Sequence, residues 1–172
     1  LYAAAEVGLA TAIISAITLL STVSMLGFDI GLVRFLPDVD NKRDLINSCL
    51  TISALLAFVV ALVFILGLKL WSPKLLFMQN NAVFIIAFVL FTVIMAMARL
   101  QEQVFIGFRS AHFTFFQSVI NGLRILLAVF LISLGAFGIF SSWGLAWCLV
   151  FVAGTLFILK LYPAYRPMPT IR

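Results

Sequence analysis

Three polar residues recur on one face of the apolar stretch 113–134, and they are the residues best suited to bind a ligand. Gln117, Asn121 and Arg124 follow one another at intervals of four and three residues, which places them on one side of a helix. Counting from Phe113 at about 1.5 Å per residue puts Arg124 about 16 Å along the helix, close to the middle of a bilayer. A guanidinium there costs about 2.5 to more than 10 kcal/mol if it faces lipid. The pattern therefore predicts a water-filled cavity for a phosphate-bearing molecule, or an interhelical structural bond.

A second pair of ionisable residues lies near the end of the apolar stretch 82–108. Arg99 and Glu102 are three residues apart, a spacing that lets the two side chains pair on one helical face. We interpret Arg99 as an arginine that extends toward the membrane surface beside a local partner. A place for both residues on the wall of a transport cavity is the alternative.

The first apolar stretch, 9–28, has no ionisable side chain but carries a row of hydroxyl groups. The members of this row step by four, three and four residues and share one helical face: Thr11, Ser15, Thr18 and Thr22. Small polar residues of this kind pack against a neighbouring helix or form the hydrophilic wall of a cavity. Thr18, inside the row, is our cavity candidate.

The sequence lacks the residue patterns of common catalytic sites. It contains no HExxH, GxSxG or phosphate-binding P-loop motif, no pair of carboxylates within a span, and a single histidine, His112. Cys49 and Cys148 stand alone in apolar surroundings, which is typical of small buried side chains rather than of a disulfide or a metal site. We therefore expect no enzymatic activity, no cofactor and no metal ion.

Composition indicates the class of protein. Hydrophobic residues make up 65% of the 172 residues, charged residues make up 10%, and the mean hydropathy is +1.24, whereas soluble domains have roughly 45–50% apolar and about 25% charged residues. The sequence therefore predicts an all-α membrane protein, a bundle of about five helices that cross the lipid bilayer. The spans are expected at residues 9–28, 45–70, 82–108, 113–134 and 138–162.

The residues around the last span carry two further expectations. Trp143 and Trp147 are expected at the membrane interface where this span begins, because tryptophan is enriched at that depth. The tail 163–172 contains three prolines, which prevent a helix, so we expect an extended linker.

The basic residues lie almost all at span ends. The net charge of +5 is therefore interpreted as a signal for orientation and not for nucleic-acid binding. Seven lysines and arginines fall on one side of the expected bundle: Arg34, Lys42, Arg43, Arg109, Lys160, Arg166 and Arg172. Lys69 and Lys74 fall on the other side. Since cytoplasmic loops carry an excess of Lys and Arg, the loop 31–44 and the C-terminus are expected in the cytoplasm.

The segment 27–38, GFDIGLVRFLPD, carries the most specific string. Its GxxxG spacing allows a neighbouring helix to approach closely, and Pro37 stops the helix, so we interpret the segment as a hinge between two spans. The string resembles the Gly-rich, ALVRF-type segment after the second transmembrane helix of oligosaccharide flippases. These are polysaccharide-biosynthesis membrane proteins of the multidrug/oligosaccharidyl-lipid/polysaccharide exporter superfamily. The likeness continues through 99–109, where VFIGFR ends a span, and into the helix that carries Arg124.

The resemblance implies both a fold and a function. The fold is a six-helix N-terminal lobe followed by a second such lobe, and this chain would hold helices two to six, without the first helix and the second lobe. The function is movement of a lipid-linked oligosaccharide or polysaccharide precursor across the cell membrane by alternating access. Two alternatives stay open. One is a cation-coupled multidrug antiporter of the same superfamily, which needs a carboxylate such as Asp29 or Glu102 in the membrane, and the other is a non-transporting membrane assembly subunit.

Overall fold

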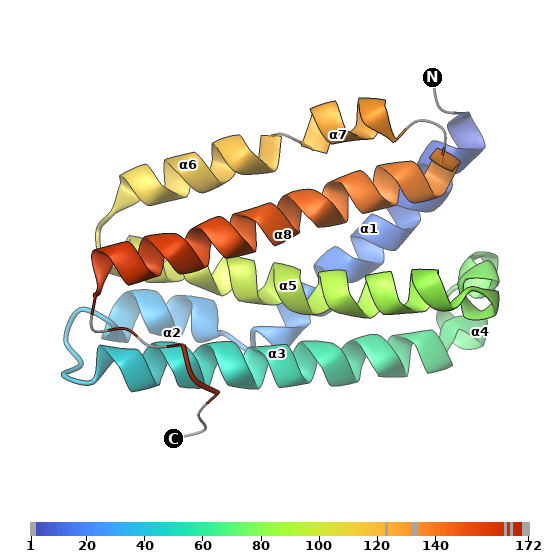
Figure 1. Ribbon diagram of the computed structural model, residues 1–172. Helices are drawn as coiled ribbons and strands as arrows, with labels where there is room; N and C mark the ends of the chain where they lie inside the picture. Colours follow the sequence, from blue (N-terminus) through green and yellow to red (C-terminus); the bar gives the residue numbers. More distant parts are fainter. Residues whose placement is uncertain (1–2, 123, 132–133, 164, 166, 170–172) are drawn as a thin grey trace.

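The computed structural model describes residues 3–122, 124–131, 134–163, 165 and 167–169, and the regular structure in them is helical (Figure 1). The elements are α1 (Ala4–Ser24), α2 (Phe28–Phe35), α3 (Lys42–Leu66), α4 (Leu68–Trp71), the 3-10 helix η1 (Pro73–Asn80), α5 (Ala82–Gly107), α6 (Ala111–Gly122), α7 (Arg124–Phe130) and α8 (Gly135–Leu161). Among the described residues, five stretches are long and apolar enough to cross a membrane: Ala4–Ser24, Lys42–Leu66, Ala82–Gly107, His112–Phe130 and Gly135–Leu161. The prediction of an all-α bundle with five spans is confirmed.

Asparagines begin two of the long helices. The side chain of Asn41 accepts a hydrogen bond from the backbone N–H of Asp44, at 3.3 Å, at the start of α3. Asn81 accepts one from Val83 N–H, at 3.0 Å, at the start of α5. A side-chain oxygen in this position satisfies a backbone donor that has no partner inside the helix. These two caps therefore fix the residues at which α3 and α5 begin.

The helix α5 is the centre of the bundle and packs against α1, α2, α3, α6 and α8. Two groups of buried apolar residues surround it. One group, around Phe88, Phe91 and Phe140, lies toward the N-terminal half of α5, and the other, around Phe105 and Leu32, lies toward its C-terminal half. The helix α7 packs on α8, and none of its described residues is buried. The buried core is therefore shared by the other elements: α1, α2, α3, α5, α6 and α8, with Leu68 of α4 and Leu75 and Met78 of η1.

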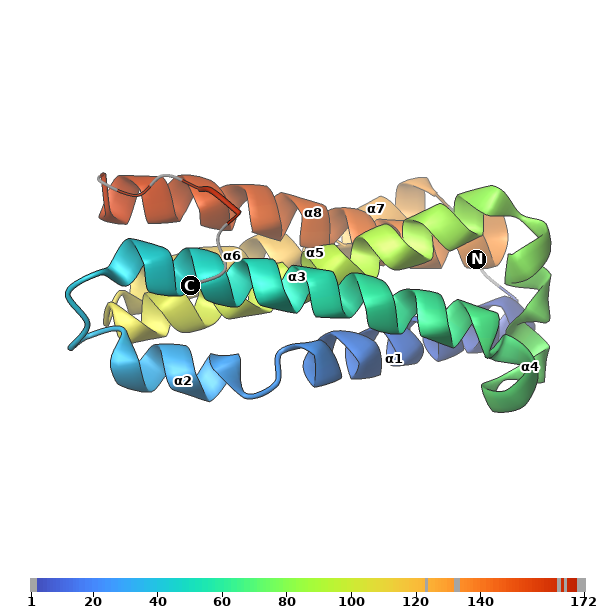
Figure 2. The ribbon, with the colours of Figure 1, turned by 90° about the horizontal axis from the view of Figure 1, so that it is seen from below.

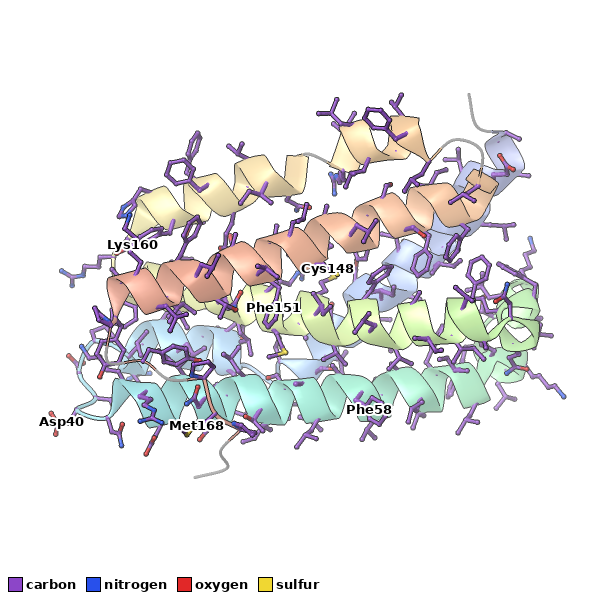
Figure 3. All side chains as sticks on the ribbon, viewed as in Figure 1. Asp40, Phe58, Cys148, Phe151, Lys160 and Met168 are labelled. Carbon is purple, nitrogen blue, oxygen red and sulfur yellow. The ribbon has the colours of Figure 1, made fainter. Side chains whose placement is uncertain are left out.

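Charged residues gather at one end of the bundle, which we call the basic end. The loop between α2 and α3 lies there, and so do the ends of α5 and α8 (Figures 1 and 2). Asp40 and Lys160 mark this end in Figure 3. Lys69 in α4 and Lys74 in η1 lie at the opposite end. The basic end thus holds more of the described lysines and arginines than the opposite end does.

The first crossing is interrupted inside the bundle. We expected one span over 9–28, but α1 ends at Ser24 and α2 starts at Phe28. Between them Leu26 has φ 47° and Gly27 has φ 82°, a left-handed conformation that ends a helix and that glycine adopts without strain. In Figures 1 and 2, α1 and α2 in series run from the opposite end to the basic end. The hinge therefore lies within a crossing and not between two spans.

The expected close helix approach at the GxxxG glycines is wrong for the described residues. A Cβ atom on Gly27 or Gly31 would meet no described atom within 4 Å. The close approach occurs instead at Gly144 of α8, where a Cβ would collide with the ring of Phe91 on α5. The role of Gly27 is conformational, because its φ is positive.

The described part of the tail folds back onto the bundle. Tyr165 is only 4% exposed and packs with Leu50 of α3 and Ile158 of α8. Arg43 donates from Nη2 to Sδ of Met168, at 3.1 Å, and Met168 lies over α3 in Figure 3. Although its described residues are non-helical, this part of the tail is docked between α3 and α8.

Candidate functional site

A polar pocket of about 40 Å³ lies between α5, α6 and α8. It is lined by Ala98, Glu102, Gln117, Ser118, Asn121, Trp147 and Val150. Three residues that the sequence singled out for a cavity, Glu102, Gln117 and Asn121, therefore line one space. The helical spacing of Gln117 and Asn121 turns both toward α5 and α8.

The pocket is bounded by polar atoms that lack partners. Gln117 is 4% exposed, yet neither its Oε1 nor its Nε2 forms a hydrogen bond with a described residue, and the same holds for Asn121 Oδ1 and Trp147 Nε1. Six of the eight buried side-chain atoms of this kind lie on α5, α6 and α8: Gln101 Oε1, Thr114 Oγ1, Gln117 Oε1 and Nε2, Asn121 Oδ1 and Trp147 Nε1. Each such atom costs about 1–3 kcal/mol if it stays unpaired. Their concentration in one region indicates a place for water or a ligand.

Two buried glutamines meet beside Gly154 of α8. A Cβ atom on Gly154 would collide with Gln101 Oε1 and Gln117 Nε2. Gln101 is 2% exposed, and its Nε2 donates to Oγ1 of Thr155, at 2.9 Å. The missing side chain at Gly154 thus lets polar groups continue from the pocket into the bundle. Gln101, Gly154 and Thr155 were not among the predicted site residues. Of the three, only Gln101 has a signal in the sequence, because it is a glutamine within an apolar helix.

Arg99 does not line the pocket, but its side chain extends toward the middle of the bundle and contacts Trp147, which does. Its Nη1 donates to Oγ1 of Thr22, at 3.1 Å, and its Cζ lies 6.0 Å from the centroid of the Trp147 ring. Trp147 stands near the middle of the 27-residue α8. Our interpretation that Arg99 extends toward the near membrane surface is therefore wrong. The reason is that helical side chains tilt toward the helix N-terminus, which for α5 lies at the opposite end.

Glu102 does not form an ion pair with Arg99. No oxygen–nitrogen contact within 4.0 Å joins them among the described residues, although Glu102 acts electrostatically on the guanidinium. Arg99 contacts Thr22 and Trp147, whereas Glu102 lines the pocket with Gln117 and Asn121. Glu102 and Arg99 therefore contact different sets of residues.

Thr18 lies away from the pocket. Of the hydroxyl row, Thr11, Ser15 and Thr22 are exposed and Thr18 is partly buried. Thr18 Oγ1 donates to the carbonyl of Ile14 and Thr22 Oγ1 to that of Thr18, both at 2.8 Å. The row therefore faces outward, while a different face of α1 packs against the bundle. It touches the site only through Thr22 and Arg99.

Arg124 also lies outside the pocket. It begins α7 and is exposed, and no described residue pairs with it. Gln117 and Asn121 belong to α6, which ends at Gly122, and position 123 lies outside the described residues. We expected Gln117, Asn121 and Arg124 on one face of a single regular helix over 113–134. The structure instead describes two helices, α6 and α7, and residues 132 and 133 also lie outside the described residues.

The expected interfacial positions of two tryptophans are wrong. Trp143 is 7% exposed and belongs to the core group with Phe91 and Phe140, and Trp147 lines the polar pocket. The helix α8 begins at Gly135, so Trp147 lies about 18 Å along it. Trp143 is buried and Trp147 is partly buried, both well inside a helix that starts before the expected span.

No protein-family model, curated protein or solved structure matches the chain. The described residues also contain no group of three or more His, Cys, Asp and Glu side chains that could hold a metal ion. The polar pocket and Arg99 are therefore the basis for a functional proposal.

Proposed function

We propose that the chain is part of a membrane transporter that moves a lipid-linked oligosaccharide or polysaccharide precursor across the cell membrane by alternating access. The observation that carries this proposal is Arg99. Its guanidinium lies beside the middle of α8, and its described contacts are one hydroxyl and one aromatic ring. A charged residue at this depth normally faces a partner or a water-filled path. Since a guanidinium has five N–H donors, donors remain for the phosphate groups of a lipid carrier.

The groups around Arg99 suit the sugar part of such a substrate. Trp147, which Arg99 contacts, offers an indole N–H, and it lines the pocket together with the amide groups of Gln117 and Asn121. Ligand sites commonly combine aromatic surface with a few polar groups of this kind. The pocket of about 40 Å³ is too small for a sugar, because it has room for only a few waters at about 10–15 Å³ each. In this proposal the pocket is the inner corner of a cavity that opens when the helices move.

The interrupted first crossing is consistent with transport. Non-helical backbone at membrane depth is tolerated where it is buried in protein or lines a cavity, and broken helices flank substrate sites in many transporters. The break at Met25–Gly27 lies beside Arg99. The resemblance of 27–38 to oligosaccharide flippases agrees with this assignment. We further propose the plasma membrane as the location, with the basic end in the cytoplasm.

The test uses the full-length protein in liposomes that contain a fluorescent isoprenyl diphosphate linked to a hexose. An impermeant quencher added outside reports which leaflet holds the fluorophore. We expect Arg99→Leu to lower the rate of exchange about tenfold or more, and Arg99→Lys to keep part of it because the charge remains. The control is Arg34→Leu, which removes an exposed arginine near the end of α2.

Equal rates for Arg99→Leu and wild type, at equal amounts of inserted protein, would refute this assignment. Loss of exchange in Arg124→Leu but not in Arg99→Leu would transfer the phosphate site to Arg124. No exchange by the wild-type protein would favour the non-transporting assembly subunit.

A cation-coupled drug antiporter is the second candidate. The observation in its favour is the membrane-embedded carboxylate of Glu102 in the polar pocket, because such coupling uses an intramembrane carboxylate. Uptake of a lipophilic organic cation into the same liposomes, together with no exchange of the isoprenyl diphosphate, would favour this reading.

A further inference from the structure

A cavity of about 140 Å³ lies beneath the docked tail, between α3, α5 and α8. It shares no lining residue with the polar pocket of the candidate site. Its described lining residues carry no charge, and most of them are apolar: Leu50, Met97, Gln101, Phe151, Thr155, Ile158, Tyr165 and Pro167. An apolar cavity of about 150 Å³ binds benzene, and a charged ligand would find no compensating charge here. The space therefore suits a compact, neutral and largely apolar molecule.

The cavity also contains one buried hydrogen-bond acceptor whose orientation is fixed. Gln101 is 2% exposed, and its Nε2 donates to Oγ1 of Thr155, at 2.9 Å. The hydroxyl of Thr155 in turn donates to the carbonyl of Phe151, at 3.0 Å, so its oxygen can only accept from Gln101 and the amide cannot be reversed. Gln101 Oε1 is the buried side-chain atom of the lining that has no partner among the described residues. We infer that this cavity binds a neutral molecule of about the size of phenol, whose hydroxyl group donates to Gln101 Oε1.

Neither a water nor Gln117 takes the place of this ligand. A buried water needs two to four polar partners, whereas the lining offers one buried side-chain acceptor without a donor. Gln117 Nε2 lies near Gln101 Oε1 on the side of Gly154, but the two atoms form no hydrogen bond. A carbonyl oxygen also has two lone pairs, so a second donor can reach Oε1 from the cavity.

The tail separates this cavity from a larger one and controls access to it. Tyr165 and Pro167 line both spaces, as do Leu50 and Met97, and the outer space of about 330 Å³ lies between the tail and α3. The described residues of the tail are non-helical and pack on the bundle through Tyr165. The tail can therefore lift without the unfolding of a helix. A ligand enters when the tail lifts and is enclosed when the tail docks.

The depth of the cavity suits a membrane-soluble alcohol. Gln101 and Thr155 each lie six residues before the end of their helix, α5 at Gly107 and α8 at Leu161, which is about 9 Å inside the basic end. Groups with an apolar body and a polar tip collect near the membrane interface, so a lipophilic alcohol or phenol can reach the site from the lipid. Binding requires neither a sugar nor transport. The inference thus goes beyond the proposed function and does not rest on it.

The test measures binding of para-fluorophenol to the full-length protein in detergent by fluorine NMR, with empty micelles as the reference for partitioning. Fluorobenzene is the matched probe, because it has the same ring and no hydroxyl group. We expect saturable binding of para-fluorophenol that is about tenfold tighter than that of fluorobenzene, since one hydrogen bond to a buried acceptor separates the two. Gln101→Leu should remove this difference and keep the binding of fluorobenzene. Gln103→Leu is the control, since Gln103 belongs to α5 but does not line the cavity, and it should change neither affinity.

Tyr165→Ala removes the wall that the tail supplies and should weaken the binding of both probes about tenfold. Size-exclusion elution and helical circular dichroism identify variants that fail to fold, and the comparison of the two probes on the wild-type protein needs no variant. Absence of saturable binding, or equal affinities of the wild-type protein for the two probes, overturns the inference even if the protein exchanges the isoprenyl diphosphate. A folded Gln101→Leu protein that still prefers para-fluorophenol overturns it as well, and so does unchanged binding by Tyr165→Ala. The expected pattern of binding without any exchange supports the cavity and refutes the proposed function instead.

Discussion

Arg99 of α5 donates a hydrogen bond from Nη1 to Oγ1 of Thr22 in the last turn of α1, at 3.1 Å, although the two residues are 77 positions apart in the chain. The backbone carbonyls at the end of a helix carry partial negative charge, so a guanidinium is favoured beside them. The backbone of Arg99 lies about 12 Å inside the basic end, because eight more residues of α5 follow it up to Gly107. The bond therefore holds the end of α1 where the first crossing is interrupted.

Replacing Thr22 by Val should lower the stability of the protein by about 1 kcal/mol, because the guanidinium loses its described acceptor. Thermal unfolding in detergent measures the change. Thr11→Val is the control, since Thr11 belongs to the same exposed row and has no described bond to another helix. Equal effects of the two substitutions would show that the contact with Arg99 adds nothing.

The outward-facing hydroxyl row should be in contact with water. After Cys49 and Cys148 are replaced by Ala, a cysteine at Thr18 should react readily with a charged thiol reagent, because reaction requires the hydrated thiolate. A cysteine at Leu19, which is 63% exposed and lies about 100° further around the helix, should react slowly if it faces lipid. Similar rates at both positions would mean that the row is not the wall of a hydrated cavity.

The orientation can be measured at two loops. With the same background, a cysteine at Asp40 should be protected from an impermeant thiol reagent in intact cells, and a cysteine at Lys74 should be labelled. The expectation follows from the position of Asp40 at the basic end and of Lys74 at the other. The reverse labelling pattern would invert the proposed orientation.

Two glycines should respond with opposite sign to the same substitution. Gly144→Ala should destabilise the protein by about 1–3 kcal/mol, because the new methyl group collides with the ring of Phe91. Gly31→Ala should be neutral or stabilising by up to about 1 kcal/mol, because no described atom lies within 4 Å of the added Cβ and alanine favours the helix. Chemical unfolding in mixed micelles gives both values, and Phe91→Leu should relieve the cost at Gly144.

Alkaline pH should release the docked tail. Burial raises the pKa of Tyr165 to about 12 from an ordinary value of 10.0, while the charge of Arg43 acts in the opposite direction. A released tail would lose this proton near pH 10, whereas the docked tail keeps it up to about pH 12. The contribution of Tyr165 is therefore complete below pH 10 and is lost as the pH rises toward 12.

An environment-sensitive dye on a cysteine at Met168 would report this release in the cysteine-free background. In a Tyr165→Phe protein the same transition should be absent from this pH interval. A transition of equal size in both proteins would assign it to another group.

The sequence was sufficient for the elements and for part of the site. The length of the apolar runs predicts five crossings, and the positions of Lys42, Arg109 and Lys160 at helix ends predict a basic end. The intervals between polar residues placed Gln117 and Asn121 on one face, and that face holds the pocket. These features depend on local periodicity, which hydropathy reports directly.

The remaining features depend on contacts between helices. The direction of Arg99 is decided by the neighbours that α1 and α8 present to it, and these are far away in sequence. The close approach is made by Gly144, which has no sequence signature, and not by the GxxxG glycines. The break at Leu26 and Gly27 requires backbone angles that an uninterrupted apolar run does not reveal.

The contact between Phe91 and Gly144 also has a mechanical meaning. A ring seated against bare backbone prevents α5 and α8 from sliding or rotating past each other without a collision. The two helices would then move together as one rigid body. By contrast, α7 has no buried residue among those described, so it can shift on the surface of α8 at small cost. Conformational change in such a protein would be concentrated in α7 and at the break after α1, while α5 and α8 keep their relative positions.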